Sequence, residues 1–131
     1  MVNYSLTDGY IVKSYPIPTH RFCQTLDLRD DPELIAMYRK IHSNEHIWVE
    51  ILEGIKSVGI LEMEIYLLGT RLFMILEMPI DLEWDNVMNR LGKLPRQEEW
   101  EAYTAHFQKA DSSASSAEKW QLMESIFHLY E

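Results

Sequence analysis

The stretch ILEMEIYLLGTRLFMILEM, residues 60–78, decides the fold of this chain. Its first part, residues 60–68, alternates between apolar and polar side chains, and its second part, residues 71–78, again has the composition of a β-strand. Only Gly69 and Thr70 separate the two parts, so the stretch predicts a β-hairpin. The first strand is expected to place Leu61, Met63, Ile65 and Leu67 on one face, and Glu62, Glu64 and Tyr66 on the other.

On the N-terminal side of this hairpin, the sequence predicts one strand and two helical pieces. Residues 21–28, RFCQTLDL, have β character and end at RDDP. Asp31 directly before Pro32 is typical of a helix N-cap followed by proline in the first turn. A second helical piece follows and is expected to end at Gly59. The apolar positions of these helices are Leu34, Tyr38 and Ile41, then Trp48, Ile51, Leu52 and Ile55.

On the C-terminal side, Asp81 is expected to cap a helix that ends at Gly92, and Pro95 to open another. Residues 111–117, DSSASSA, predict a loop, and residues 119–129, KWQLMESIFHL, predict the last strand. The resulting order is βαββαβ with partly doubled helices, which indicates an α+β fold of the ferredoxin-like type. Its antiparallel sheet carries helices on one face only. Since both faces contain large apolar residues, we predict a homodimer closed sheet against sheet, a dimeric α+β barrel, with a pocket in each half.

The size and composition fit one soluble domain at residues 21–131, preceded by an N-terminal extension at residues 1–20. The formal charge of −9 argues against nucleic acid and against an anionic membrane surface as partners. No apolar run approaches the ~20 residues of a membrane span. The extension lacks the basic start and apolar run of a signal peptide. Cys23 is the single cysteine, which is compatible with a reducing cytosol, so we expect a cytoplasmic protein.

Two histidines lie four residues apart in YRKIHSNEHIW, residues 38–48, and allow three interpretations. A metal site is disfavoured, because Glu45 precedes the second histidine and no third ligand follows at regular spacing. An acid/base role suits His42 better, since Tyr38 lies one helical turn before it and both side chains can reach one polar ligand. The third possibility is structural: His42 packs beside Tyr38 at the helix boundary, and His46 is a solvated surface residue.

Aromatic and acidic residues give weaker indications of a pocket. The four tryptophans each fit an apolar face and are mostly expected in the core, although one or two beside His42 and Tyr38 would suit a monosaccharide. Charged residues within a sheet usually lie at edges or in pairs, so one of the strand carboxylates reaching the pocket is a second possibility. No glycine-rich phosphate loop and no GxSxG motif is present. The residues in question are Trp48, Trp84, Trp100 and Trp120, and Glu62, Glu64 and Glu77.

Five ordered segments together resemble the L-rhamnose mutarotase family, and MEIYLLGTRLFM and EKW are similar to its L-fucose-type branch. The segments are TLDLRDDPELIAMYRKIH, IWVEI, GILEMEIYLLGTRLFMILE, PRQEEWEAY and EKWQLMESIFHL, so the resemblance runs from Arg21 to Leu129. It implies a protein that dimerises into an α+β barrel. The implied activity is that of an isomerase that interconverts the α and β anomers of a 6-deoxy sugar and needs no metal and no cofactor. An alternative function is that of a non-catalytic sugar sensor or sugar-binding module on the same barrel. A third alternative, an oxygenase or haem-degrading enzyme, is disfavoured by the polar Tyr/His/Glu set.

The resemblance also implies which residues form the site. The family's catalytic histidine follows its substrate-binding tyrosine by four positions, a pair that matches His42 and Tyr38, with His46 as the alternative to His42. The family's pocket tryptophan matches Trp100, and a pocket tyrosine of rhamnose-type members is replaced by Met63. A second tryptophan of those members is Glu99 here, and both departures favour L-fucose over L-rhamnose. Lys119 and Trp120 belong to the fucose-like signature and are expected to bind sugar or to be structural.

Overall fold

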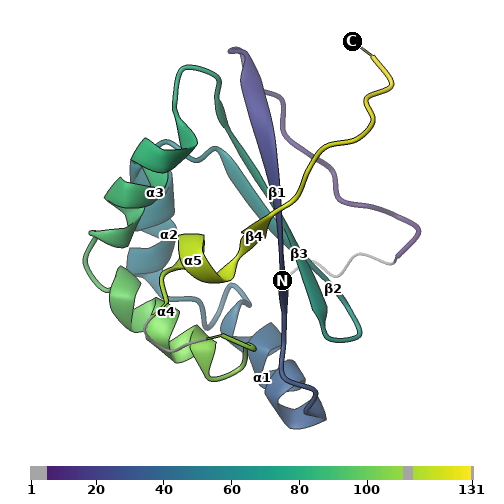
Figure 1. Ribbon diagram of the computed structural model, residues 1–131, viewed down its shortest axis with the longest axis vertical. Coiled ribbons are helices and arrows are strands. Elements are labelled where there is room, and N and C mark those ends of the chain that lie inside the picture. The colour runs from purple at the N-terminus through teal and green to yellow at the C-terminus, as the bar shows by residue number, and fades with distance from the viewer. Residues whose placement is uncertain (1–5, 111–113, 131) are drawn as a thin grey trace.

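The computed structural model describes residues 6–110 and 114–130. The order βαββαβ is confirmed, with two helices in the first crossover and three in the second (Figure 1). The elements are β1 (Thr19–Asp27), α1 (Pro32–Ile41), α2 (Val49–Ser57), β2 (Glu62–Leu68), β3 (Arg71–Pro79), α3 (Trp84–Gly92), α4 (Gln97–Ala105), α5 (Ser116–Lys119) and β4 (Gln121–Leu122). Within the described residues, no helix is both long enough and apolar enough to cross a membrane.

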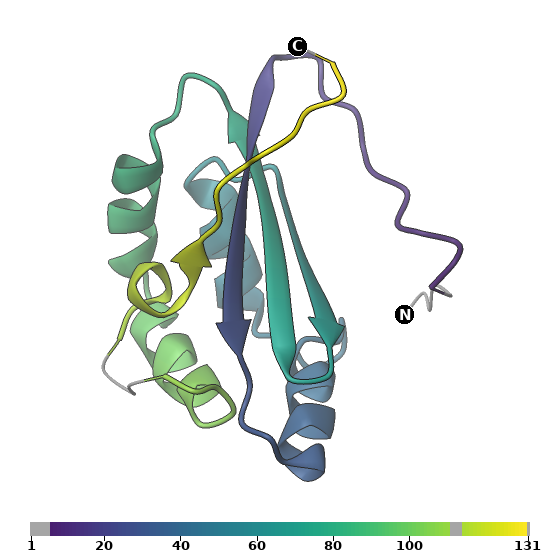
Figure 2. The same ribbon diagram turned by 45° about the vertical axis from the view of Figure 1, so that its right-hand side comes forward.

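The four strands form one antiparallel sheet in the order β2-β3-β1-β4, which is the ferredoxin-like arrangement predicted from the sequence. The β2–β3 hairpin is confirmed, with Leu68 opposite Arg71. Gly69 in its turn has φ = 60°, a left-handed conformation that glycine adopts without a steric penalty. The helices cover one face of the sheet, as the two views in Figures 1 and 2 show.

The core lies between the helices and the sheet, and side chains of β3 point alternately toward it and away from it. Leu72, Met74, Leu76 and Met78 of β3 are buried there, while their neighbours along the strand lie on the opposite, outer face. The first helix begins where the sequence predicts, because the Asp31 carboxylate accepts hydrogen bonds from the backbone N–H groups of Glu33 and Leu34 at 2.9 and 3.3 Å.

The third helix begins later than predicted. Asp81 is not its N-cap: Glu83 holds that position, without a side-chain capping bond. The reason is a turn before the helix, in which the N–H of Leu82 donates to the carbonyl of Pro79 at 3.1 Å. Asp81 lies within this turn, so the helix starts after it. The fourth helix likewise begins after Pro95, at Gln97, with Arg96 in a left-handed conformation (φ = 66°).

The predicted strand at residues 119–129 is wrong except for two residues. Lys119 ends the short helix α5, which a capping box between Ser115 and Glu118 starts inside the predicted loop. Residues 111–113 of that loop lie outside the described residues. Gln121 and Leu122 form β4 beside Thr25 and Gln24 of β1, and the N–H of Met123 donates to Cys23. Residues 123–130, here named the C-terminal arm, then leave the sheet as an extended segment, because residues 6–110 and 114–130 contain no neighbouring strand for them (Figure 2).

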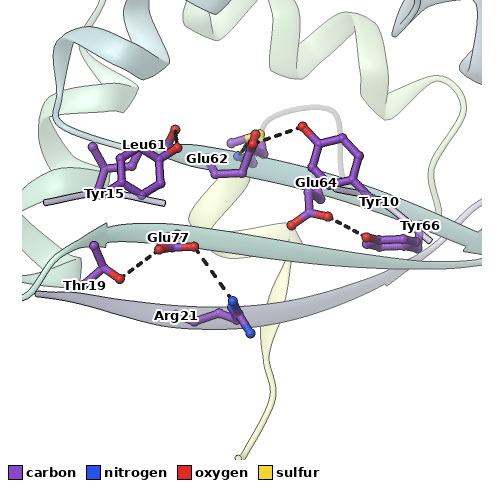
Figure 3. A network of polar contacts seen from close by, with 10 residues as sticks. Tyr10, Tyr15, Thr19, Arg21, Leu61, Glu62, Glu64, Tyr66 and Glu77 are labelled. Atoms are coloured by element: carbon purple, nitrogen blue, oxygen red, sulfur yellow. Dashed lines mark hydrogen bonds and ion pairs between the residues drawn. The ribbon is translucent and has the colours of Figure 1, made fainter. Parts of the chain in front are cut away.

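The N-terminal extension, where it is described, has no helix or strand before β1 and is tied to the start of β2 by two tyrosines. Tyr15 Oη donates to the carbonyl of Leu61 at 2.9 Å, and Tyr10 Oη donates to Glu62 Oε2 at 3.2 Å (Figure 3). The strand carboxylates are paired on this side of the molecule as well. Glu64 accepts a hydrogen bond from Tyr66, and Glu77 accepts one from Thr19 at 2.8 Å and lies 3.8 Å from Arg21.

Candidate functional site

A cavity of about 380 Å³ lies between the helix-covered face of the sheet and helices α1, α2 and α4. Its size falls in the range of small-molecule sites, roughly 300–1,000 Å³. Apolar side chains from β2, β3 and α2 form much of the wall, among them Met63, Ile65, Met74, Leu76, Ile51 and Ile55. The polar side chains of the wall are Gln24, Tyr38, His42, Asn44, Lys56, Glu62, Gln97, Thr104, Gln108 and Ser116, most of them from elements other than these three.

His42 and Tyr38 both line this cavity, at the C-terminal end of α1. The helix ends at Ile41, where Ser43 Oγ donates to the carbonyl of Lys40 at 2.7 Å, so His42 becomes the C-cap. His42 Nδ1 lies 2.8 Å from the carbonyl oxygen of Tyr38, and the two rings are 4.3 Å apart. Since a carbonyl can only accept, Nδ1 carries the proton and Nε2 is left with a free lone pair.

Burial sets the protonation states of this pair. It lowers the pKa of His42, an effect that the hydrogen bond to the Tyr38 carbonyl opposes. Burial also raises the pKa of the Tyr38 phenol to about 12, against the hydrogen bond from Gln108. At neutral pH the site therefore presents a neutral imidazole beside a protonated phenol, which is a proton acceptor beside a hydrogen-bond donor.

An aromatic cluster supports the histidine from α4. The ring of Trp100 meets that of His42 edge-on at 5.4 Å and that of Trp48 at 5.1 Å. Trp48 in turn stacks on Tyr103, with 5.6 Å between the ring centres and 7° between the planes, and the Arg96 guanidinium lies 4.2 Å from its ring centre. The contact with Trp100 restrains the His42 ring, so the cluster orients the imidazole as well as filling the core.

The structure brings five of the six predicted site residues together and separates the sixth. Tyr38, His42, Met63, Trp100 and Trp120 all line the cavity, whereas Lys119 is absent from its wall. Lys119 is buried, and its Nζ donates to the Glu101 carbonyl at 2.7 Å and to Thr104 Oγ1 at 3.0 Å, so it ties α5 to α4. Burial lowers the pKa of this ammonium group to about 8, while Glu101 acts in the opposite direction.

The two histidines have different surroundings. His46 is exposed, lies outside the cavity wall, and has its Nδ1 2.9 Å from Ser43 Oγ. Among the described residues, no group of three or more His, Cys, Asp or Glu side chains is placed to hold a metal ion. Trp84 packs on Phe22 at 4.8 Å, away from the cavity.

The sequence analysis missed three glutamines in the cavity wall: Gln24, Gln97 and Gln108, all of them buried. A signal existed for Gln24, which occupies a core-facing position between Phe22 and Leu26 in β1. A polar residue at such a position needs a hydrogen-bond partner or a function. Gln108 follows the end of α4, and no local pattern in the sequence marks it.

The fold and the cavity define a class: ferredoxin-like α+β proteins in which a histidine and a tyrosine face a cavity of small-molecule size. Comparison with known proteins gives the family. The family model for L-rhamnose mutarotase matches residues 21–129, and the chain belongs to this family, whose members are isomerases of the mutarotase type.

Individual relatives agree with this assignment. An L-fucose mutarotase of Xanthomonas campestris is 37% identical over 111 residues, covering 85% of this chain and 89% of the relative. A UPF0734 protein of Dictyostelium discoideum is 36% identical over 112 residues, covering 82% of this chain and 88% of that protein. The crystal structure of an L-rhamnose mutarotase from Formosa agariphila matches with a TM-score of 0.58 at 15% identity, over 84% of this chain and 98% of that one, which supports the fold.

Proposed function

We propose that this mutarotase interconverts the α and β anomers of L-fucose, with His42 and Tyr38 as the catalytic pair. The observation that supports this most directly is that the His42 imidazole and the Tyr38 phenol line the same cavity, with His42 Nδ1 bonded to the Tyr38 carbonyl. L-Fucose is favoured over L-rhamnose because the relative from Xanthomonas campestris is named an L-fucose mutarotase, and because Met63 and Glu99 replace aromatic residues of rhamnose-type members. The apolar wall suits the methyl group of a 6-deoxy sugar.

The proposed reaction needs only proton transfers. His42 Nε2 accepts the proton of the anomeric hydroxyl, the bond between C1 and the ring oxygen breaks, and C1 becomes an aldehyde carbon. The imidazolium then gives its proton to the former ring oxygen, which lay next to the anomeric oxygen because both were bonded to C1. Rotation about the C1–C2 bond and reversal of both transfers give the other anomer. The Tyr38 phenol donates a hydrogen bond to the oxygen on which negative charge builds up.

Saturation-transfer NMR on L-fucose and L-rhamnose tests this function directly. We expect the protein to raise the exchange rate between the anomeric proton signals of L-fucose above the buffer rate, and to do so more weakly for L-rhamnose. Exchange at the buffer rate together with measurable L-fucose binding would instead favour the non-catalytic sugar-binding module.

The catalysed rate is expected to fall in acid with an inflection below pH 6.5, the ordinary histidine value. Burial lowers the pKa of His42, so the imidazole stays neutral down to a lower pH and accepts a proton until it is itself protonated. The measurement is kcat/KM for L-fucose against pH, after subtraction of the buffer rate, beside an NMR titration of the His42 ring protons. An inflection above pH 6.5 in both curves would contradict the proposed base.

We also propose that the protein is a cytoplasmic homodimer. The C-terminal arm is apolar and exposed: Ile126 is 87% and Phe127 75% exposed in the single chain. On the outer face of the sheet, Tyr66 and Leu68 are exposed as well. Exposed apolar groups of this extent are typical of an interface, and a second copy can supply both a neighbouring strand and a covering sheet. In the reducing cytosol the free Cys23 stays a thiol.

Phe127→Asp is expected to shift the protein from dimer to monomer, because a carboxylate at the interface must lose its water. Ser125→Asp is the matched control, since it adds the same charge to the same arm at a polar position, and it is expected to remain dimeric. Light scattering coupled to gel filtration measures the mass of each. A monomeric wild-type protein, or a dimeric Phe127→Asp variant, would argue against the arm as the interface.

A further inference from the structure

Gln108 is a polar residue of the cavity wall that the proposed chemistry does not yet use. Its backbone is fastened to the end of β1 by a bridge to Leu28, and the bonds on either side run from Arg29 N to Phe107 O (3.0 Å) and from Lys109 N to Asp27 O (2.9 Å). The Arg29 side chain also donates to the Gln108 carbonyl at 3.2 Å. The side chain therefore extends from a rigid point, and only 1% of the residue is exposed.

The amide group of Gln108 is directed at Tyr38. Its Nε2 donates to Tyr38 Oη at 3.2 Å, while its Oε1 is buried without a hydrogen-bond partner among the described residues. A buried acceptor of this kind is normally paired in a folded protein, so the unpaired end indicates that the amide is placed for more than packing. A hydroxyl-rich ligand in the cavity has donors that can meet it.

The direction of the Gln108–Tyr38 bond matters for chemistry. A phenol has one proton and can also accept. Because Tyr38 Oη accepts from the Gln108 amide, its own proton remains free for a ligand in the cavity. Phe107 assists by packing edge-on against the Tyr38 ring at 6.2 Å, which limits the rotation of the phenol away from the amide.

We propose that Gln108 is a positioning residue of the mutarotase reaction: its amide orients the Tyr38 phenol so that the phenol donates to the sugar, and its Oε1 accepts a hydrogen bond from a sugar hydroxyl. This inference rests on the proposed function, since it assigns a role in that same site. A neutral amide is required, because a carboxylate at this point would accept the phenol's proton and withdraw it from the sugar.

Two substitutions separate this role from a structural one. Gln108→Met keeps an unbranched side chain of similar length and removes both polar ends. Gln108→Glu keeps the shape and, in acid, regains a donor when the carboxylate is protonated. Asn86→Asp, an exposed amide-to-carboxylate change on α3, is the control with the same chemical change away from the cavity. The measurements are kcat and KM for L-fucose anomer exchange by NMR across pH, and the thermal midpoint of each variant.

We expect Gln108→Met to lower kcat by roughly 10–100-fold, the effect of a misplaced catalytic group, with a smaller change in KM. The kcat of Gln108→Glu should be lowered to a similar degree at neutral pH. The ratio of its kcat to that of wild type, measured at the same pH, should rise as the solution becomes acidic. Wild-type kcat in Gln108→Met, or loss in Gln108→Glu that stays constant across pH, would overturn the proposal. If wild type itself fails to exchange anomers, the proposed function fails instead, so the two failures are distinguishable.

A double-substitution cycle with Tyr38→Phe gives an independent test in folded variants. If Gln108 acts on the reaction through the Tyr38 hydroxyl, Gln108→Met added to Tyr38→Phe should lower kcat by less than threefold further, while the loss of the sugar hydrogen bond to Oε1 should still raise KM. Full multiplicative losses in the double variant would show that the two residues act separately and would overturn the positioning role.

Discussion

Replacing His42 with alanine is expected to lower the catalysed exchange of L-fucose anomers by roughly 10²–10⁴-fold, the usual contribution of a positioned acid/base group. The His42 imidazole can accept a proton at Nε2, because its Nδ1 is bonded to the Tyr38 carbonyl. Burial lowers the pKa of His42, which keeps the ring neutral. Sugar binding should persist, since Tyr38, Trp100 and the apolar wall remain. Saturation-transfer NMR gives the exchange rate and titration of tryptophan fluorescence gives the affinity.

His46→Ala is the matched control for this experiment. His46 is the same residue type four positions later, but it is exposed and bonded to Ser43 outside the cavity. Its removal should leave the exchange rate within twofold of wild type. Activity that survives in His42→Ala and disappears in His46→Ala would reverse the assignment and would imply that the end of α1 rearranges when sugar binds.

The strength of the local signals explains how far sequence reasoning reached for the fold. The alternation over residues 60–68, the strand composition of residues 71–78 and the two residues between them predicted two strands and their turn, because a strand with a buried face must repeat every two residues. The end of the chain was misassigned because residues 119–129 are as apolar as a strand, yet a strand also needs a neighbour. The described part of the chain provides a neighbouring strand for Gln121 and Leu122 and none for the C-terminal arm.

For the site, spacing within one helix was informative and contacts between distant segments were not. Tyr38 and His42 lie one turn apart on α1, so their joint presence in the cavity followed from the 3.6-residue period. The sequence left two roles open for Lys119, sugar binding and a structural one, and its ammonium group bonds to the end of α4. Gln108 meets Tyr38 across 70 residues of sequence, and only the pairing of residues 107–109 with the end of β1 brings them together.

Trp100→Ala is expected to reduce stability by roughly 3–5 kcal/mol, the usual cost of removing a buried aromatic side chain. Trp100 is 8% exposed and touches His42, Trp48 and Tyr103, so its loss opens a hole at the junction of α1 and α4. The same hole lies beside the imidazole. We therefore expect the affinity for L-fucose and the exchange rate to fall together, which chemical denaturation and NMR measure on the same samples.

Trp100→Phe distinguishes the two roles of this side chain. A phenyl ring keeps an aromatic edge against His42 and fills part of the volume of the indole. Most of the stability lost in Trp100→Ala should therefore return. The exchange rate should also return only if the role of Trp100 is to orient the imidazole. If both stability and exchange return in Trp100→Phe, the result supports the role of Trp100 in orienting the imidazole. Restored stability without exchange means that the indole itself contacts the sugar, as aromatic faces do with the C–H groups of a pyranose. Undiminished stability of Trp100→Ala would contradict the packing role assigned to Trp100 within the aromatic cluster of Trp48, Trp100 and Tyr103.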